Sequence, residues 1–150
     1  MSRTMNILLV EDNELDAMVL SRALAKVAPS ANILRARDGI EALEILKTPD
    51  PALAVPRPFF ILLDINMPRM NGHEFLESMR KLDGEAGNVV FMFTTSDSPK
   101  DIAMAYQNNV SGYIVKPQDT KGLRDVLGIL QGFWSICEFP TASELDLQPL

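Results

Sequence analysis

The sequence predicts an α/β protein in which helices cover both faces of a parallel sheet. Short apolar runs that suit strands alternate with longer stretches of helical spacing, which is the pattern of repeated βαβ units. Two runs, 59–63 and 89–93, are apolar at every position, as expected for strands that are buried on both faces. Right-handed crossovers between such strands place the helices on the two faces of the sheet.

Five strands and five helices are expected in alternation along the chain. Asp38-Gly39 opens the second helix, Asn71-Gly72 precedes the third, and Ser98-Pro99 begins the fourth with a capping residue and a proline. The expected strands are Ile7–Val10, Ile33–Ala36, Phe59–Leu63, Val89–Phe93 and Tyr113–Val115.

The first and last helices are predicted from the spacing of their apolar residues. Those at positions 20, 23, 24 and 27 share one helical face, and those at 123, 126, 127 and 130 share another. Residues 48–58 contain four prolines, so we expect a surface loop there rather than a helix or a strand. After Trp134 the helical pattern gives way to an acidic segment.

The composition fits one globular domain and excludes several classes of protein. The chain has 150 residues and a formal net charge of -6, so it lacks the clustered positive charge that nucleic-acid binding requires. Its single Cys and single His cannot form an internal disulfide or a structural zinc site. No apolar run approaches the ~20 residues that cross a bilayer, and the first residues lack the apolar core of a signal peptide. We therefore expect a cytoplasmic domain with no nucleic-acid or membrane partner.

Polar side chains follow four of the expected strands. Glu11 and Asp12 follow the first strand, and Asp64 follows the third. Thr94 follows the fourth and Lys116 the fifth. Because ligands of open α/β sheets bind outside the carboxyl ends of the strands, we expect these side chains to converge on one edge of the sheet.

Three carboxylates that lie close together need a cation, because each pair repels by roughly 1–4 kcal/mol, depending on the local dielectric. Hard oxygen ligands suit Mg²⁺, and a carboxylate beside that ion can act as a nucleophile toward phosphorus. Lys116 and Thr94 would then bind oxygens of the phosphoryl group. The residues alone also allow a plainer interpretation, in which Glu11 and Asp12 charge the start of a helix and Lys116 is a surface charge.

Four motifs resemble those of the receiver domains of two-component response regulators. They are LLVEDN, LLDINMPRMNG, FTTS and GYIVKP, and the resemblance spans residues 5–134. It implies a flavodoxin-like (βα)5 fold, doubly wound, with a five-stranded parallel sheet of order 2-1-3-4-5. It also implies a receiver domain over residues 1–135, followed by a short acidic tail over residues 136–150 that serves as a dimer arm.

The resemblance gives the acidic residues their roles. Asp64 is the expected phosphoacceptor, and it takes a phosphoryl group from a sensor histidine kinase or a phosphotransfer protein. Mg²⁺ is expected to be held by Asp12 and Asp64 directly, by Glu11 through water and by the main-chain carbonyl of Asn66.

The resemblance also assigns the residues that respond to the phosphoryl group. Lys116 binds a phosphoryl oxygen, and its bond to Pro117 is expected to be cis. Thr94 swings toward the phosphoryl group, which lets the ring of Tyr113 move inward. These two residues form the expected two-state switch.

Within the family, the chain is most similar to stand-alone receivers of bacteriophytochrome-type histidine kinases. This similarity rests on the proline-rich loop before the third strand, the TTS sequence at 94–96, Phe133-Trp134 and Phe139-Pro140. It implies a homodimer formed through the fourth helix, the fifth strand, the fifth helix and the aromatic tail. The same aromatic residues fit a second interpretation equally well, in which they cover the flank of the sheet.

Three other functions remain open from the sequence. A pseudo-receiver would keep the fold only as a docking module. A phosphohydrolase of the haloacid dehalogenase type would also use an Asp nucleophile with Mg²⁺, but it usually needs a second acid two residues later, where this chain has Asn66. A flavin carrier would need a phosphate-binding cluster in the first loop, which is missing.

His73 is expected to face solvent on the third helix.

Overall fold

Strands and helices alternate along the chain in the computed structural model, which describes residues 3–140. All helix starts predicted from capping residues are confirmed, with Asp38, Asn71 and Ser98 each accepting a hydrogen bond from the first turn of its helix. In chain order the elements are β1 (Asn6–Val10), α1 (Glu14–Val27), β2 (Asn32–Ala36), α2 (Gly39–Lys47), β3 (Phe60–Leu63), α3 (Gly72–Arg80), β4 (Val89–Thr94), α4 (Pro99–Gln107), β5 (Gly112–Val115) and α5 (Thr120–Ile136).

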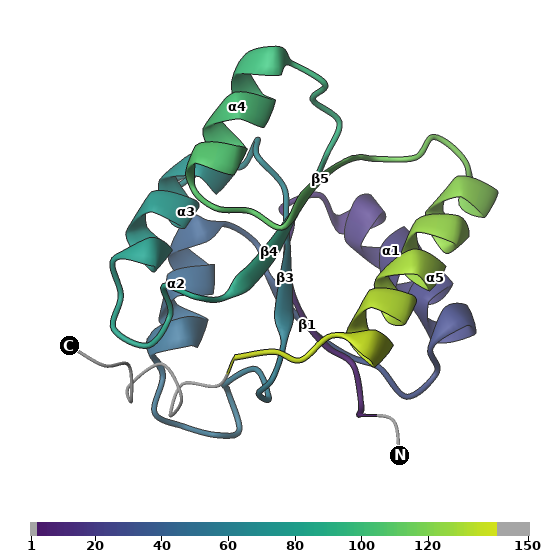
Figure 1. Ribbon diagram of the computed structural model, residues 1–150, viewed down its shortest axis with the longest axis horizontal. Helices are drawn as coiled ribbons and strands as arrows, with labels where there is room; N and C mark the ends of the chain where they lie inside the picture. The colour runs from purple at the N-terminus through teal and green to yellow at the C-terminus, as the bar shows by residue number, and fades with distance from the viewer. Residues whose placement is uncertain (1–2, 141–150) are drawn as a thin grey trace.

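The five strands form one parallel sheet in the order β2-β1-β3-β4-β5, which confirms the expected topology. Helices α1 and α5 lie together on one face of the sheet, and α2, α3 and α4 lie on the other (Figure 1). Each strand of the central three is buried along almost its whole length, because a helical layer covers it on both sides. None of the helices within residues 3–140 is long and apolar enough to cross a membrane.

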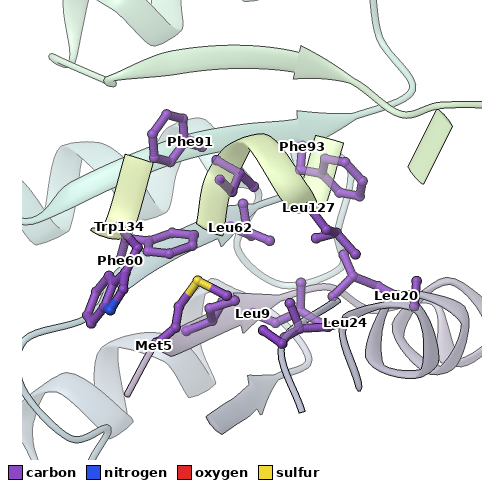
Figure 2. Close-up of a cluster of buried hydrophobic side chains, with 14 of the residues drawn as sticks. Met5, Leu9, Leu20, Leu24, Phe60, Leu62, Phe91, Phe93, Leu127 and Trp134 are labelled. Atoms are coloured by element: carbon purple, nitrogen blue, oxygen red, sulfur yellow. The ribbon is translucent and has the colours of Figure 1, made fainter. Parts of the chain in front are cut away.

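Aromatic side chains fill the core beneath α1 and α5. Phe60 of β3 lies at the centre of this group, with its ring centroid 5.7 Å from that of Phe91 and 6.0 Å from that of Trp134 (Figure 2). Phe139 follows α5 and packs 4.6 Å from the Trp134 ring. Both Trp134 and Phe139 are buried, so of the two interpretations that the sequence left open, the structure agrees with the one in which they cover the flank of the sheet.

The segment that leads into β1 is tied to the segment that follows α5. The Arg3 guanidinium donates hydrogen bonds to the main-chain carbonyls of Trp134 and Cys137, and the indole Nε1 of Trp134 donates to the Arg3 carbonyl at 3.2 Å. Arg3 also lies over the rings of Trp134 and Phe139, at 5.0 and 5.4 Å from their centroids. These cation–π contacts hold the chain after α5 against the sheet as far as Phe139. The rest of the expected tail, residues 141–150, lies outside the described residues.

The long loop is confirmed, since residues 48–59 contain neither helix nor strand. It carries a cis peptide bond between Arg57 and Pro58. Within residues 3–140 this is the only cis bond, so the expected cis bond between Lys116 and Pro117 is wrong. Trans is the more stable isomer of most bonds to proline, and Lys116 reaches its acidic partners with a trans bond after it.

Candidate metal centre

The parallel register brings three carboxylates together at the carboxyl ends of β1 and β3. Val10 pairs with Leu63 at the ends of these strands, so Glu11, Asp12 and Asp64 leave the sheet at the same level. One ligand oxygen from each of the three side chains lies within 4.8 Å of the others. The expected convergence of acidic residues on one edge of the sheet is therefore confirmed.

The acidic cluster, which consists of Glu11, Asp12 and Asp64, is buried on one side and open on the other. Glu11 and Asp64 are buried, whereas Asp12 is exposed. The main-chain N–H of Ile65 donates to Asp64 Oδ1 at 2.8 Å, which fixes the Asp64 carboxylate where its strand ends. The exposed carboxylate of the acidic cluster is therefore that of Asp12.

Lys116 supplies the positive charge nearest to the acidic cluster. It follows β5, and its main-chain N–H donates to the carbonyl of Thr94 at 2.7 Å. Its ammonium Nζ donates to Glu11 at 2.6 Å, to Asp16 at 2.9 Å and to Asp64 at 3.3 Å. Burial lowers the pKa of Lys116, but the hydrogen bonds to Glu11 and Asp16 and the charge of Asp64 together raise it above its ordinary value. Lys116 is therefore a permanent cation in this site.

Glu11 shows that one ammonium does not fully compensate the acidic cluster. Burial, and then the charge of Asp64, raise the pKa of Glu11 to about 7, although the hydrogen bond from Lys116 opposes the change. A divalent cation among these oxygens would remove this penalty, because it would neutralise the repulsion between the carboxylates. The donor set therefore fits a hard divalent metal ion.

Thr94 and Tyr113 lie on the last two strands of the sheet, β4 and β5. Thr94 ends β4 and is completely buried. Tyr113 lies on β5 and is partly buried, and its hydroxyl donates to the main-chain carbonyl of Ser96 at 2.9 Å. Burial raises the pKa of the Tyr113 hydroxyl above its ordinary value, so this group stays a hydrogen-bond donor at neutral pH. A buried hydroxyl and an anchored phenol thus lie on neighbouring strands.

The comparison with protein families agrees with this geometry. A sequence model of the response regulator receiver domain matches residues 7–128, which include all the strands except the first residue of β1. The chain belongs to this family. It is therefore a receiver domain, and the resemblance carried by its four motifs is confirmed.

The receiver is similar to known regulators in sequence and in structure. FilR2 of Methanothrix harundinacea, named as a probable methanogenesis regulatory protein, is 33% identical over 129 residues, which are 85% of this chain and 82% of FilR2. The crystal structure of the phosphorylated cyanobacterial phytochrome response regulator RcpA has a TM-score of 0.82 at 30% identity and covers 93% of this chain and 100% of RcpA. That of the Mn²⁺-bound response regulator Rcp1 has a TM-score of 0.75 at 29% identity and covers 90% of this chain and 98% of Rcp1.

Asn66 lies in the receiver's loop between β3 and α3 and is exposed. The loop is held at both ends. Arg69 pairs with the buried N-cap of α2, Asp38, at 2.6 Å, and the main-chain N–H of Gly72 donates to the carbonyl of Ile65 at 2.8 Å. The loop is thus fixed next to Asp64, and the role of the Asn66 carbonyl as a metal ligand stays a prediction.

One residue of the site, Asp16, was not predicted from the sequence, and the burial of a second residue, His73, which lies outside the site, was predicted wrongly. Asp16 lies in the first turn of α1 and contacts Lys116, which is 100 positions away in the chain. The only sign of this contact in the sequence is an acidic residue near the start of a helix. His73 is buried on α3, so its expected exposure is wrong. It lies on the inner face of the helix with Leu76 and Met79, and this three-residue spacing was the signal that could have shown its burial.

Proposed function

We propose that this chain is a single-domain response regulator that accepts a phosphoryl group on Asp64 from a sensor histidine kinase or a phosphotransfer protein. The observation that carries the proposal is the position of Lys116. Its ammonium reaches both Asp64 and Glu11 at the open acidic cluster, where it can hold a phosphoryl oxygen beside the attacking carboxylate. The similarity to RcpA over the whole length of that chain supports the single-domain form.

In the proposed transfer, an Asp64 carboxylate oxygen attacks the phosphorus of a phosphohistidine. The new O–P bond forms as the N–P bond breaks, and the imidazole nitrogen keeps the electron pair and takes up a proton. Lys116 is placed to bind one phosphoryl oxygen, and the hydroxyl of Thr94 is placed at the end of the neighbouring strand to bind another. Catalysis of this kind depends on positioning and charge neutralisation, which these residues supply.

Mg²⁺ is the proposed cofactor. Asp12, Asp64 and the Asn66 carbonyl would hold it directly, and Glu11 would hold it through water. When bound, the ion supplies the positive charge that offsets the repulsion among the carboxylates and the phosphoryl group. The acidic cluster and the Mn²⁺ named in the Rcp1 structure support this proposal. Mg²⁺ titration by calorimetry tests it, and Asp12→Asn is expected to lose most of the affinity.

Thr94 and Tyr113 form the proposed switch. Phosphorylation of Asp64 would draw the Thr94 hydroxyl toward the new phosphoryl oxygens, and the space that it leaves would change the packing of the Tyr113 ring. The burial of Thr94 supports this role, because a fully buried side chain cannot move without affecting its neighbours. The hydrogen bond of Tyr113 to Ser96 gives the switch a defined arrangement without phosphate.

A phytochrome-type sensor kinase is the proposed phosphodonor, and the description of RcpA as a phytochrome response regulator supports it. We also propose a homodimer through α4, β5 and α5. The aromatic tail, which was expected to take part, is left out because Trp134 and Phe139 are buried in the core of their own chain. These three elements carry exposed large apolar residues, namely Tyr106 on α4, Val115 on β5, and Ile129 and Ile136 on α5. Light scattering tests the dimer, and a mass of one chain at micromolar concentration, with and without phosphorylation, would exclude it.

The experiment for the main function compares the wild-type chain with two variants. Each is incubated with Mg²⁺ and a small phosphodonor, and the intact mass is measured under conditions that preserve acyl phosphates. We expect an adduct of one phosphoryl group on the wild type and none on Asp64→Asn. Asp83→Asn is the matched control, because Asp83 is exposed and lies in the turn after α3, so it should be modified like the wild type. An adduct that persists in Asp64→Asn contradicts the proposal.

The same preparations separate the competing functions. Repeated release of phosphate from an ester substrate would identify a phosphohydrolase of the haloacid dehalogenase type. A chain that binds neither Mg²⁺ nor a phosphoryl group would be a pseudo-receiver that acts only as a docking module.

A further inference from the structure

A polar link connects α3, α4 and the loop after β4. It consists of His73, Asp101 and Ser96. Asp101 accepts a hydrogen bond from Ser96 Oγ at 2.6 Å through Oδ2 and one from His73 Nε2 at 3.1 Å through Oδ1. The two oxygens of one carboxylate thus join two helices and a loop that are separate in the chain.

One end of the polar link reaches Tyr113. Ser96, whose hydroxyl donates to Asp101, also supplies the main-chain carbonyl that accepts the Tyr113 hydroxyl at 2.9 Å. The main-chain N–H of Ser98 donates to Ser96 Oγ at 3.2 Å, which closes a tight turn before α4. The orientation of the Ser96 carbonyl therefore depends on a side chain that Asp101 holds in place.

The other end of the polar link is fixed close to Asp64. His73 directly follows Gly72, and a Cβ on Gly72 would lie 2.3 Å from the main-chain oxygen of Asp64. The start of α3 is thus pressed against the backbone of the proposed phosphoacceptor. His73 is fixed in place because the start of α3 is fixed against Asp64. The polar link therefore runs from the surroundings of Asp64 to Tyr113.

The hydrogen bonds within the polar link are of a strong kind. His73 is buried, and Asp101 is its one polar side-chain contact among the described residues. Hydrogen bonds to a carboxylate are stronger than those between neutral groups. In agreement, the bonds from Ser96 and then from His73 lower the pKa of Asp101 below its ordinary value.

We propose that His73 is a positioning residue for the switch, which acts through Asp101 and Ser96 to hold the carbonyl that receives the Tyr113 hydroxyl. The proposal rests on the proposed function, because that function assigns Tyr113 to the switch. His73 does not touch the acidic cluster, so its effect is expected on Tyr113 and not on the metal ligands.

The test uses the full chain labelled with 3-fluorotyrosine and observed by ¹⁹F NMR. The chain contains two tyrosines, and Tyr106→Phe assigns the resonance of Tyr113. We expect His73→Leu to move or broaden the Tyr113 resonance before any ligand is added, because the Asp101 carboxylate that holds Ser96 loses one of its two hydrogen-bond donors. His73→Gln keeps an amide N–H near the position of Nε2 and should restore the wild-type resonance. Leu76→Met is the control for packing, since Leu76 is buried on the same helix without a polar partner.

Two outcomes overturn the proposal. One is a folded His73→Leu variant with the wild-type Tyr113 resonance, and the other is an equal shift in His73→Leu, His73→Gln and Leu76→Met, which would indicate packing alone. If His73→Leu does not fold, Ser96→Ala tests the same prediction from the other end of the link. Beryllofluoride with Mg²⁺ added to the wild type tests the proposed Thr94–Tyr113 switch separately from the positioning role of His73. If it leaves Tyr113 unchanged, the proposed switch fails, whatever the variants show without ligand.

Discussion

Lys116 forms ion pairs with three carboxylates, and only Glu11 and Asp64 belong to the acidic cluster. The third partner, Asp16, lies on α1 and is partly exposed. Asp16 competes for the same ammonium that a phosphoryl group on Asp64 would need. The resting position of Lys116 is thus a balance between α1 and the phosphorylation site.

Asp16→Asn should increase the affinity for beryllofluoride with Mg²⁺. Removal of one competing charge leaves Lys116 freer to bind the phosphoryl analogue. A partly exposed ion pair contributes roughly 0.2–1 kcal/mol, so we expect a gain in affinity of about 1.4- to 5-fold. Isothermal titration calorimetry measures it. Glu14→Gln is the matched control, because Glu14 lies in the same helical turn but pairs with Arg35 and Arg37. A weaker affinity in Asp16→Asn would show that Asp16 positions Lys116 instead of competing for it.

Asp101 should make the stability of the protein depend on acid pH. Its pKa in the folded state is lowered from 3.8, first by the bond from Ser96 and then by the bond from His73. A lowered folded-state pKa means that the stabilisation is present above pH 3.8 and is lost as pH falls through the folded-state value.

Urea unfolding of the wild type and Asp101→Asn between pH 7 and pH 3 checks this prediction. The difference in their free energies of unfolding should stay constant down to about pH 5 and shrink below about pH 4, close to the ordinary pKa of an Asp. A difference that is the same over the whole range would contradict it.

The sequence predicted the site residues at strand ends but not those on helices. Glu11, Asp64 and Lys116 could be found because parallel strands place their carboxyl ends at one edge, whatever the details of packing. The contacts of Asp16 and His73 depend on how α1 and α3 pack against other elements. No local pattern records such a contact, although the helical spacing of His73 does record its burial.

At the scale of single elements, the start of α3 is fixed both by its cap and by a close approach to the main chain of Asp64. Its N-cap Asn71 makes a capping box with Glu74, and its first residue, Gly72, lies against the main chain of Asp64. No side chain fits at position 72 without a shift of the helix or of the acidic site.

Gly72→Ala should therefore destabilise the protein by about 2 kcal/mol, the cost of forcing one methyl group into a packed site. Gly132→Ala provides the opposite case in α5, because nothing lies within 4 Å of a Cβ there. It should stabilise the protein by about 0.5–1 kcal/mol, since Ala favours a helix over Gly. Urea unfolding measures both changes. Equal effects of the two substitutions would show that the close approach at Gly72 is relaxed without cost.

The strands were predicted to within one residue because each contains a short apolar run, which in the buried central strands covers nearly every position. The differences have identifiable causes. Asn6 and Asn32 begin β1 and β2 as polar residues, and the Nδ2 of Asn32 donates to the Oδ1 of Asn6 at 3.0 Å. A cross-strand side-chain bond of this kind has no signature in either segment alone.

At the scale of the whole molecule, the core under α1 and α5 is closed by a residue that follows the last helix. Phe139 packs on Phe60, Phe133 and Trp134. The spacing of apolar residues ends before it, so the sequence left its position open between the sheet and a dimer contact. Likewise, the strand order came from the resemblance to a family, because alternation of strands and helices does not decide which strands are neighbours.

Phe139→Ala should lower the free energy of unfolding by about 3 kcal/mol, near the lower end of the range for a buried Phe. Ile136→Ala serves as the control from the same segment, because Ile136 is 83% exposed and its loss should change the free energy by less than about 0.5 kcal/mol. Chemical unfolding monitored by Trp134 fluorescence measures both. If Phe139→Ala were as mild as Ile136→Ala, the segment after α5 would contribute nothing to the core.

The contacts of Arg3 bring the beginning of the described chain next to its end, where its guanidinium pairs with Glu138 at 3.1 Å. A new peptide connection between the two ends could therefore replace one of the existing loops. A circularly permuted protein, joined by a linker at this point and opened within the proline-rich loop 48–58, should keep the same sheet and the same acidic cluster. The native structure would then not depend on the order in which the five βα units follow one another along the chain.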